Sequence, residues 1–272
     1  RLYTILQSLF VLVPSSHGDV KVVKSGVEFS GRVPYWTHFY LYKDLIVDTG
    51  CSHTAVEVRE FLGERKGVVL LTHHHEDHIG GAIALQGRLK IFAPLKSLPL
   101  LEHPPELPDY RKLVWGQPQP LKAHPLPSSL CFGGLEVEVF ETPGHTFDHV
   151  SFLVDGKLFA GDLVVAPGQM VCMRQEELRD TMISLRKILK LDFEYAYTGV
   201  GVFSKEEVKA YLEYLGGLRK KVEELHRKGK SPRDIVKEVF PHPPEIVQLM
   251  EVVSDGEWSR ENMVRSLLGL PR

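Results

Sequence analysis

The sequence contains little cysteine and almost no asparagine. Its three cysteines, Cys51, Cys131 and Cys172, are scattered and form no Cys-x-x-Cys pair. This spacing argues against a disulfide framework and predicts reduced, buried thiols in a cytoplasmic protein. Asn262 is the single asparagine among 272 residues, while Lys, Arg and Glu are abundant. This bias indicates a thermophilic source.

The chain also lacks an excess of either charge. Its formal net charge is −2, so it has no overall cationic field to attract nucleic acid or an anionic membrane. The net charge does not exclude a local basic patch. The apolar stretch from Leu2 to Val13 resembles part of a signal peptide, but it lacks a basic lead-in and a clear cleavage site. It is also too short to span a bilayer, so we expect it to form opening strands.

Apolar runs and their spacing predict a chain of short strands with a few helices. Strands are expected at Val20–Val23, Phe39–Tyr42, Leu45–Val47, Val68–Leu71, Leu89–Phe92, Leu135–Phe140, Val150–Val154, Leu158–Ala160 and Tyr195–Tyr197, and helices at Ala55–Leu62, Gly80–Leu85 and Arg179–Leu191. Nine prolines lie between Pro94 and Pro127, and neither a regular helix nor a central strand is expected to run through such a stretch. This stretch is predicted to be an ordered surface excursion, either a loop packed on the core or a wall of a substrate cleft.

The sequence changes character after residue 204. Apolar residues recur at helical spacing over Lys205–Lys228, and Ser231-Pro232 predicts the start of another helix. Two further short helices are expected, at Glu245–Val253 and at Glu261–Leu268. We therefore predict a catalytic domain over 1–204 and a helical appendage over 205–272. The apolar stripe of the appendage covers the core, packs against a second copy in a homodimer, or shapes the substrate cleft.

The segment His73-His74-His75-Glu76-Asp77-His78 is the strongest chemical signal, and it follows an apolar strand. In an extended segment alternate side chains share one face, so we expect His73, His75 and Asp77 to converge, with His78 added from the next helix. Neutral imidazole and carboxylate are natural donors to a divalent metal. By the same alternation, His74 and Glu76 should point elsewhere and have structural or supporting roles.

The segment His73–His78 resembles the metal motif of the metallo-β-lactamase superfamily. Leu45–Gly50 is similar to that family's early strand and turn, Thr142–Thr146 to the block with its third histidine, and Phe159–Asp162 to the block with its bridging aspartate. The resemblance covers about residues 1–204. It implies an α/β fold, an αββα four-layer sandwich with the metals at one edge, followed here by the C-terminal helical appendage.

The resemblance also implies how the metal ligands are divided. His73, His75 and His145 would hold the first ion; Asp77 and His78 would hold the second, with Asp162 as the bridge. One block departs from the family, because Val200 stands where its members usually carry a last histidine. His149 and His53 are candidate substitutes, although a role other than ligand is favoured for both. We expect one or two Zn²⁺ ions, with Fe or Mn as alternatives.

These features predict a hydrolase in which a metal-activated water attacks a small ester, thioester or lactone. Asp77 would orient the nucleophile or carry its proton, and His149 would donate a hydrogen bond to the substrate. The layout is similar to the glyoxalase-II-like and β-lactamase-like-protein-2 branches, which include thioesterases, lactonases and endoribonucleases. A phosphodiesterase acting on RNA is disfavoured by the near-neutral charge.

Two further alternatives stay open. A mononuclear iron centre held by His73, His145 and Asp162 would resemble the persulfide dioxygenases of the same family. A binding module without catalysis, with one structural metal, is suggested by Val200 alone. Elemental analysis of the purified protein separates these alternatives from a zinc hydrolase.

Overall fold

The computed structural model describes residues 9–165 and 167–272, so the part of the expected opening strand over 2–8 lies outside the described residues. Its first sheet has the strand order β1-β2-β3-β4-β5-β6-β7 within the described chain. The bounds are β1 (Leu9–His17), β2 (Val20–Glu28), β3 (Thr37–Tyr42), β4 (Leu45–Val47), β5 (Val68–Leu70), β6 (Lys90–Ala93) and β7 (His124–Pro125). Pairing is antiparallel from β1 to β4 and parallel from β4 to β7.

The second sheet has the order β14-β13-β11-β10-β9-β8, and a small antiparallel pair joins β12 to β15. The bounds are β8 (Ser129–Phe132), β9 (Leu135–Glu141), β10 (Val150–Val154), β11 (Lys157–Gly161), β12 (Cys172–Met173), β13 (Tyr195–Thr198), β14 (Gly201–Ser204) and β15 (Trp258–Ser259). Every strand expected from an apolar run is present. The sequence pattern did not predict β7, β8, β12, β14 and β15, which are at most four residues long.

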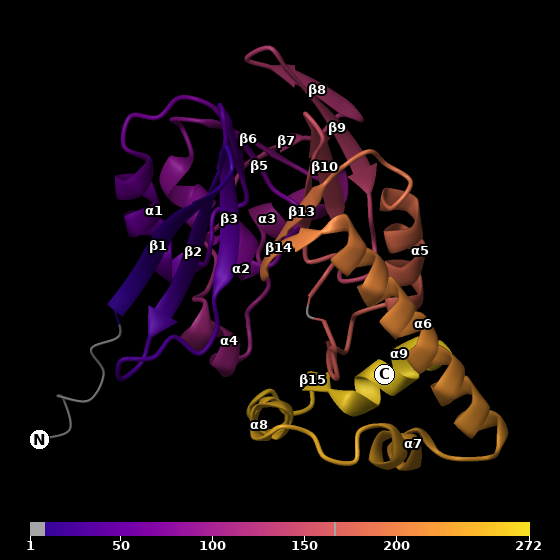
Figure 1. The fold of residues 1–272 in the computed structure, drawn as a ribbon. Coiled ribbons are helices and arrows are strands. Elements are labelled where there is room, and N and C mark those ends of the chain that lie inside the picture. The colour runs from indigo at the N-terminus through magenta and orange to yellow at the C-terminus, as the bar shows by residue number, and fades with distance from the viewer. Residues whose placement is uncertain (1–8, 166) are drawn as a thin grey trace, which may run out of the picture.

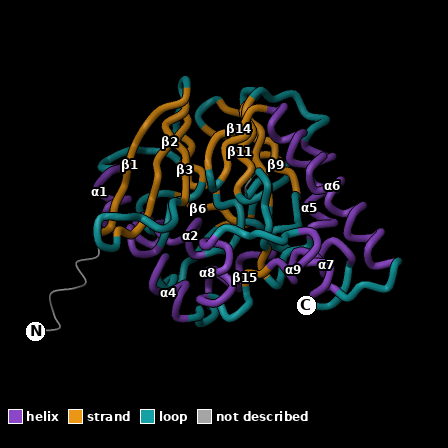
Figure 2. Tube along the Cα trace, turned by 60° about the horizontal axis from the view of Figure 1, so that its bottom comes forward, coloured by secondary structure: helices purple, strands orange, loops and turns teal. Residues whose placement is uncertain are grey.

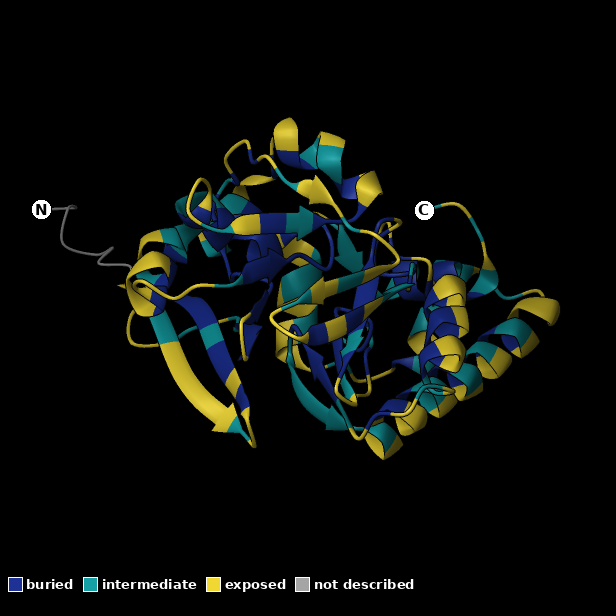
Figure 3. Cartoon of the chain, turned by 90° about the horizontal axis from the view of Figure 1, so that it is seen from above, coloured by how far each residue is buried: buried dark blue, intermediate teal, exposed yellow. Residues whose placement is uncertain are grey.

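The two sheets pack face to face between outer helices (Figure 1). Side chains of β3 alternate, so that Tyr40 faces the second sheet while Phe39 packs with Val58 of α1 (Ala55–Leu62) on the outer face. On the other side, α5 (Leu178–Ile188) and α6 (Lys205–Arg227) cover the second sheet. Figure 3 shows the buried strand residues between the partly exposed outer helices. The predicted αββα sandwich is confirmed.

The proline-rich stretch contains more regular structure than we expected. Two short helices form there, α3 (Leu98–Glu102) and α4 (Asp109–Val114). A further short helix, α2 (Glu76–Ile79), lies before this stretch, in the histidine-rich segment. Pro99 lies in the first turn of α3, and Pro108 is the residue before α4. Proline fits a helix start, where no backbone N–H bond is lost, so the prolines limit the length of these helices without preventing them.

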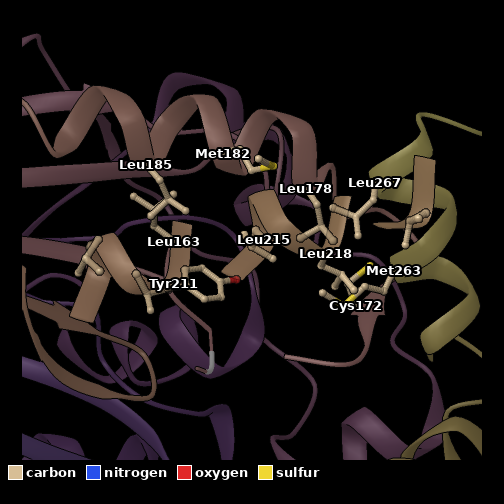
Figure 4. Packing of buried hydrophobic residues seen from close by; sticks show 14 of the residues in the cluster. Leu163, Cys172, Leu178, Met182, Leu185, Tyr211, Leu215, Leu218, Met263 and Leu267 are labelled. Carbon is tan, nitrogen blue, oxygen red and sulfur yellow. The ribbon is translucent and has the colours of Figure 1, made fainter. Parts of the chain in front are cut away.

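Three C-terminal helices, α6, α7 (Pro232–Val239) and α9 (Arg260–Leu268), continue the core of the second sheet. Between α7 and α9, α8 (Glu245–Val253) has no buried residue. Leu215 of α6 and Met263 of α9 pack in the same buried cluster as Leu185 of α5 (Figure 4). The boundary near residue 204 stays a prediction. None of the helices in the described part of the chain is long and apolar enough to cross a membrane.

All three cysteines lie in the described part of the chain and are free thiols. Cys51 and Cys172 are buried, as predicted, and burial raises the pKa of both thiols. Cys131 on β8 is exposed, so the expectation of a buried side chain is wrong there. The exposed positions of this short outer strand alternate with half-buried ones, and Cys131 falls on the exposed side.

Candidate metal centre

Strand ends of both sheets meet at one edge of the sandwich. His73 lies just beyond β5, and Asp162 follows β11 in the other sheet. His145 comes from the turn between β9 and β10. A rigid scaffold thus presents side chains that are distant in sequence at one place. Figure 2 shows α2, α4 and α8 gathered at the same edge, together with β15.

Three buried histidines form the first group of potential metal donors. One ring nitrogen from each of His73, His75 and His145 lies within 4.8 Å of the others. Nδ1 of His75 is 3.0 Å from Nε2 of His145. Burial and the neighbouring histidines lower the pKa of His73 and of His75 well below the usual value. Both rings are therefore neutral, which is the form that binds metals.

A second group consists of His73, His78 and Asp162, whose potential donor atoms also lie within 4.8 Å of one another. Oδ1 of Asp162 is 3.1 Å from Nε2 of His78, and Oδ2 is 3.3 Å from Nε2 of His145. Burial alone would raise the pKa of Asp162, but the adjacent His78 and His145 lower it overall. The carboxylate thus faces both groups, as a bridging ligand would.

The buried donor atoms fit a divalent metal. Nε2 of His73, Nε2 of His78 and Oδ1 of Asp162 have no hydrogen-bond partner in the described structure. Buried polar atoms without partners are costly unless another group satisfies them. The separations known inside each group, 3.0 Å between His75 and His145 and 3.1 Å between His78 and Asp162, are short enough for both atoms of a pair to bind a single ion. The individual ligand roles stay predictions.

Asp77 lies beside this centre, but not on the extended face that was predicted for it. The backbone turns helical at Glu76, so Asp77 lies on α2 and does not continue an extended face with His73 and His75. Its Oδ2 lies 3.7 Å from Nε2 of His78 and accepts a hydrogen bond from the Thr37 hydroxyl at 3.1 Å. Burial raises the pKa of Asp77 to about 6. The residue therefore borders the second donor group, outside the three-histidine group.

Two carboxylates that the sequence analysis did not select hold the histidines in place. Glu176 Oε1 accepts a hydrogen bond from Nδ1 of His145 at 2.7 Å, and Asp48 Oδ2 accepts one from Nδ1 of His78 at 2.7 Å. Each contact favours a proton on Nδ1, the tautomer in which Nε2 would be the donor to a metal. Against the effect of burial, Asp162 and these carboxylates also raise the pKa of both histidines. The sequence indicates Asp48 only as the first residue of the turn Asp48-Thr49-Gly50. Nothing in the local pattern around Glu176 identifies it.

His149 is buried with both ring nitrogens engaged inside the protein. Nδ1 lies 2.9 Å from the hydroxyl of Thr142, and Nε2 accepts a hydrogen bond from the backbone N–H of Asp162 at 3.0 Å. Burial lowers the pKa of His149 to about 3. This placement favours positioning of Asp162 over the predicted donation to substrate, and it leaves no ring nitrogen for a substitute ligand.

His74 and Glu76 bond to groups outside the predicted ligand set; at Glu76 this cannot follow from strand alternation, because the backbone turns helical there. Nδ1 of His74 lies 2.9 Å from both carboxylate oxygens of Asp148, which also accepts a hydrogen bond from Ser97 at 2.6 Å. Burial would raise the pKa of Asp148, but these contacts lower it to about 2. Glu76 is buried and forms a bidentate pair with Arg111 of α4, at 2.6 and 2.7 Å.

The position of the expected last histidine is occupied by Val200 in the turn between β13 and β14. The preceding Gly199 packs so closely on the centre that a Cβ there would clash with Asp162 and His78. His53, the other candidate substitute, turns its Nε2 to the carbonyl of Lys112 at 2.7 Å. A substitute for the missing histidine is therefore found at neither of the two positions considered.

The family follows from comparison with known sequences. The model of the Metallo-beta-lactamase superfamily matches residues 40–200, which include every predicted ligand. The chain belongs to the metallo-β-lactamase superfamily. The recognition made from the ordered motifs is thereby confirmed, and a His/Asp cluster in this fold implies a divalent metal.

Curated relatives within the superfamily include hydrolases. A hydroxyacylglutathione hydrolase of Idiomarina loihiensis is 31% identical over 148 residues, which cover 54% of this chain and 52% of that protein. A β-lactamase-like protein 2 homolog of Drosophila melanogaster is 29% identical over 218 residues, covering 77% of this chain and 68% of that protein. The chain thus spans about half the length of the hydroxyacylglutathione hydrolases that it matches.

Solved structures share the fold at low identity. A metallo-β-lactamase family protein from Thermus thermophilus superposes with a TM-score of 0.55 at 19% identity, covering 96% of this chain and 90% of that one. The metallo-β-lactamase FIM-1 from Pseudomonas aeruginosa, in its mono-zinc form, gives a TM-score of 0.56 at 16% identity, with 76% and 94% coverage. These likenesses support the architecture.

Proposed function

We propose that this protein is a zinc-dependent hydrolase of a small ester or thioester. The observation that carries the proposal is the pair of donor groups that share His73, with buried nitrogen and oxygen atoms that no protein group satisfies. Membership of the metallo-β-lactamase superfamily and the hydrolase relatives support the same reaction class. A zinc ion bound there would supply a water with a pKa near 7.

Two residues beside the donor groups, Asp77 and Gln175, have supporting roles in the proposed reaction. Asp77 lies beside His78 and is aligned by the Thr37 hydroxyl, so its carboxylate is placed to orient a nucleophile or accept a proton. Gln175 contacts Nε2 of His75 at 2.8 Å, which keeps the Nδ1 atom of that ring directed toward His145. Orientation of this kind lowers the entropic cost of reaching the transition state.

A cavity of about 410 Å³, lined by neighbours of the ligands but by none of the ligands themselves, is a candidate substrate site. Its lining includes His74 and Gln175, which neighbour the ligands, and the exposed aromatic ring of Phe147. The volume lies in the range of small-molecule pockets. A thioester is favoured because relatives are named hydroxyacylglutathione hydrolases, and the net charge of −2 gives no general attraction for RNA.

A mononuclear iron oxygenase is the second candidate, because Val200 removes one expected ligand and favours a single tight metal. Elemental analysis of protein purified without added metal separates the two. Zinc with turnover of a hydroxyacyl-glutathione thioester supports the hydrolase. Bound iron, together with oxygen consumption in the presence of a persulfide, would support the iron oxygenase and rule out the zinc hydrolase.

The hydrolase proposal is tested with the His75→Ala variant and a matched surface control, His103→Ala, whose side chain is exposed. We expect His75→Ala to lose bound zinc and at least a hundredfold in kcat/KM, and His103→Ala to match the wild type. Substrates should include a hydroxyacyl-glutathione thioester, a nitrophenyl ester and a phosphodiester. Wild-type protein with zinc bound but no turnover of any of them would refute the proposal.

A further inference from the structure

The C-terminal segment, residues 257–272, contacts the residues that position the predicted metal ligands, although it is remote from them in sequence. Its main contact is Ser266 of α9, which is fully buried. The Ser266 hydroxyl donates to the backbone carbonyl of Glu176 at 2.6 Å and accepts from the backbone N–H of Leu178 at 2.8 Å. Arg272 donates to the same Glu176 carbonyl. Two residues of this segment therefore anchor the peptide that carries Glu176.

The Glu176 side chain is held as firmly as its backbone. Oε2 accepts the backbone N–H of Met173 at 2.6 Å, while Oε1 accepts Nδ1–H of His145. Met173 belongs to β12, which pairs with Trp258 of β15 in the C-terminal segment. The loop from 172 to 177 is thus clamped between β15 and α9, and it presents Glu176 to His145.

A second connection runs through α4. Arg111 pairs with Glu76, which lies between two predicted ligands in sequence, and its Nη1 donates to Glu257 at 2.9 Å. Tyr110 donates to the other oxygen of Glu257 at 2.7 Å. Glu257 directly precedes β15. The C-terminal segment therefore reaches both the loop behind His145 and the helix that carries Asp77 and His78.

We propose that the C-terminal segment positions the metal centre, with Ser266 and Arg272 acting through Glu176 on His145. This inference rests on the proposed metal site. The segment is then more than a cover for the second sheet, because its contacts set the orientation and proton position of a ligand. Removing partners that orient a metal-bound histidine typically lowers metal affinity by about 10- to 100-fold.

The test measures zinc affinity of the full chain by competition with a chromophoric chelator, alongside thermal unfolding of the metal-free protein. We expect Glu176→Gln to weaken binding about tenfold or more and Ser266→Ala to weaken it severalfold. Arg272→Ala removes the other donor and serves if Ser266→Ala does not fold. Ile91→Val, at a buried site on β6 in the first sheet and outside the cluster that contains α9, controls for loss of stability alone.

A double variant distinguishes positioning from general destabilisation. If Ser266 acts through Glu176, adding Ser266→Ala to Glu176→Gln should weaken zinc binding no further. Unchanged affinity in Ser266→Ala and Arg272→Ala, or full additivity with Glu176→Gln, would overturn the inference while leaving the hydrolase proposal in place. Wild-type protein that binds no divalent metal would overturn both.

Discussion

The buried pair of Glu76 and Arg111 should be one of the most sensitive points in the molecule. Glu76 is 2% exposed and Arg111 is 7% exposed, and their two hydrogen bonds of 2.6 and 2.7 Å form a bidentate contact. The change Arg111→Ala leaves the Glu76 carboxylate buried without a partner and also removes the contact of Arg111 with the more exposed Glu257. Breaking a buried pair in this way costs about 3–5 kcal/mol of folding free energy.

The loss should be visible in urea and thermal unfolding. A protein with a typical stability of about 5–15 kcal/mol would lose a large fraction of it, and the melting temperature would fall by roughly 6 to 20 °C. Arg233→Ala is the matched control, because its side chain is 81% exposed and its contact with Glu261 is a surface pair of 3.2 Å. That variant should change stability by about 1 kcal/mol or less.

Replacing both partners with apolar residues provides the critical comparison. Glu76→Leu combined with Arg111→Met removes the two charges together, so the double variant should be more stable than Arg111→Ala. If Arg111→Ala loses no more than Arg233→Ala, Glu76 must be hydrated or neutral in the folded protein. The reasoning from an unpaired buried charge would then be refuted.

Three further predictions concern the centre and its support. Val200→His should raise tightly bound metal from near one per chain toward two by elemental analysis; two equally tight metals in the wild type would contradict this. Gly199→Ala should weaken zinc binding at least tenfold, because its Cβ would clash with Asp162, whereas Gly217→Ala meets nothing within 4 Å and should bind normally. Burial would raise the pKa of Asp148, but its hydrogen bonds lower it to about 2. Because that pKa lies below the unfolded value of about 3.9, the stability advantage over Asp148→Asn should be full above pH 5 and shrink as the pH falls toward 2 in thermal melts; a constant difference would contradict it.

Most of the fold could be predicted because long apolar patterns report burial directly. The helical spacing in Lys205–Arg227 and the apolar runs of β3 and β5 reflect faces that must be buried, whatever they pack against. The pair of β12 and β15 could not be predicted. Each strand has two residues, and the pairing joins Met173 to Trp258 across more than eighty residues of sequence. Such short pairs depend on the tertiary structure.

In the candidate site, too, the sequence identifies some residues, whereas others can be identified only from the structure. His73, His78, His145 and Asp162 could be selected because their chemical types and ordered spacing are themselves the signal. Asp77 was selected by an argument from extended backbone, but the chain turns helical one residue earlier. The residues that orient the ligands carry no such signal. Glutamate is common on protein surfaces, and only the folded chain shows that Glu176 is buried against His145.

The domain boundary predicted near residue 204 also depends on the difference between local sequence pattern and tertiary contacts. The prediction rests on apolar residues that recur at helical spacing among Lys, Arg and Glu after residue 204, and Ser204 does cap α6 with a capping box. A change in local pattern, however, marks only a change in secondary structure. Leu215 and Met263 share a buried cluster with Leu185, and removal of the helices would expose the outer side of the second sheet. Folding of the second sheet and order in the loop behind His145 should therefore depend on the same C-terminal contacts.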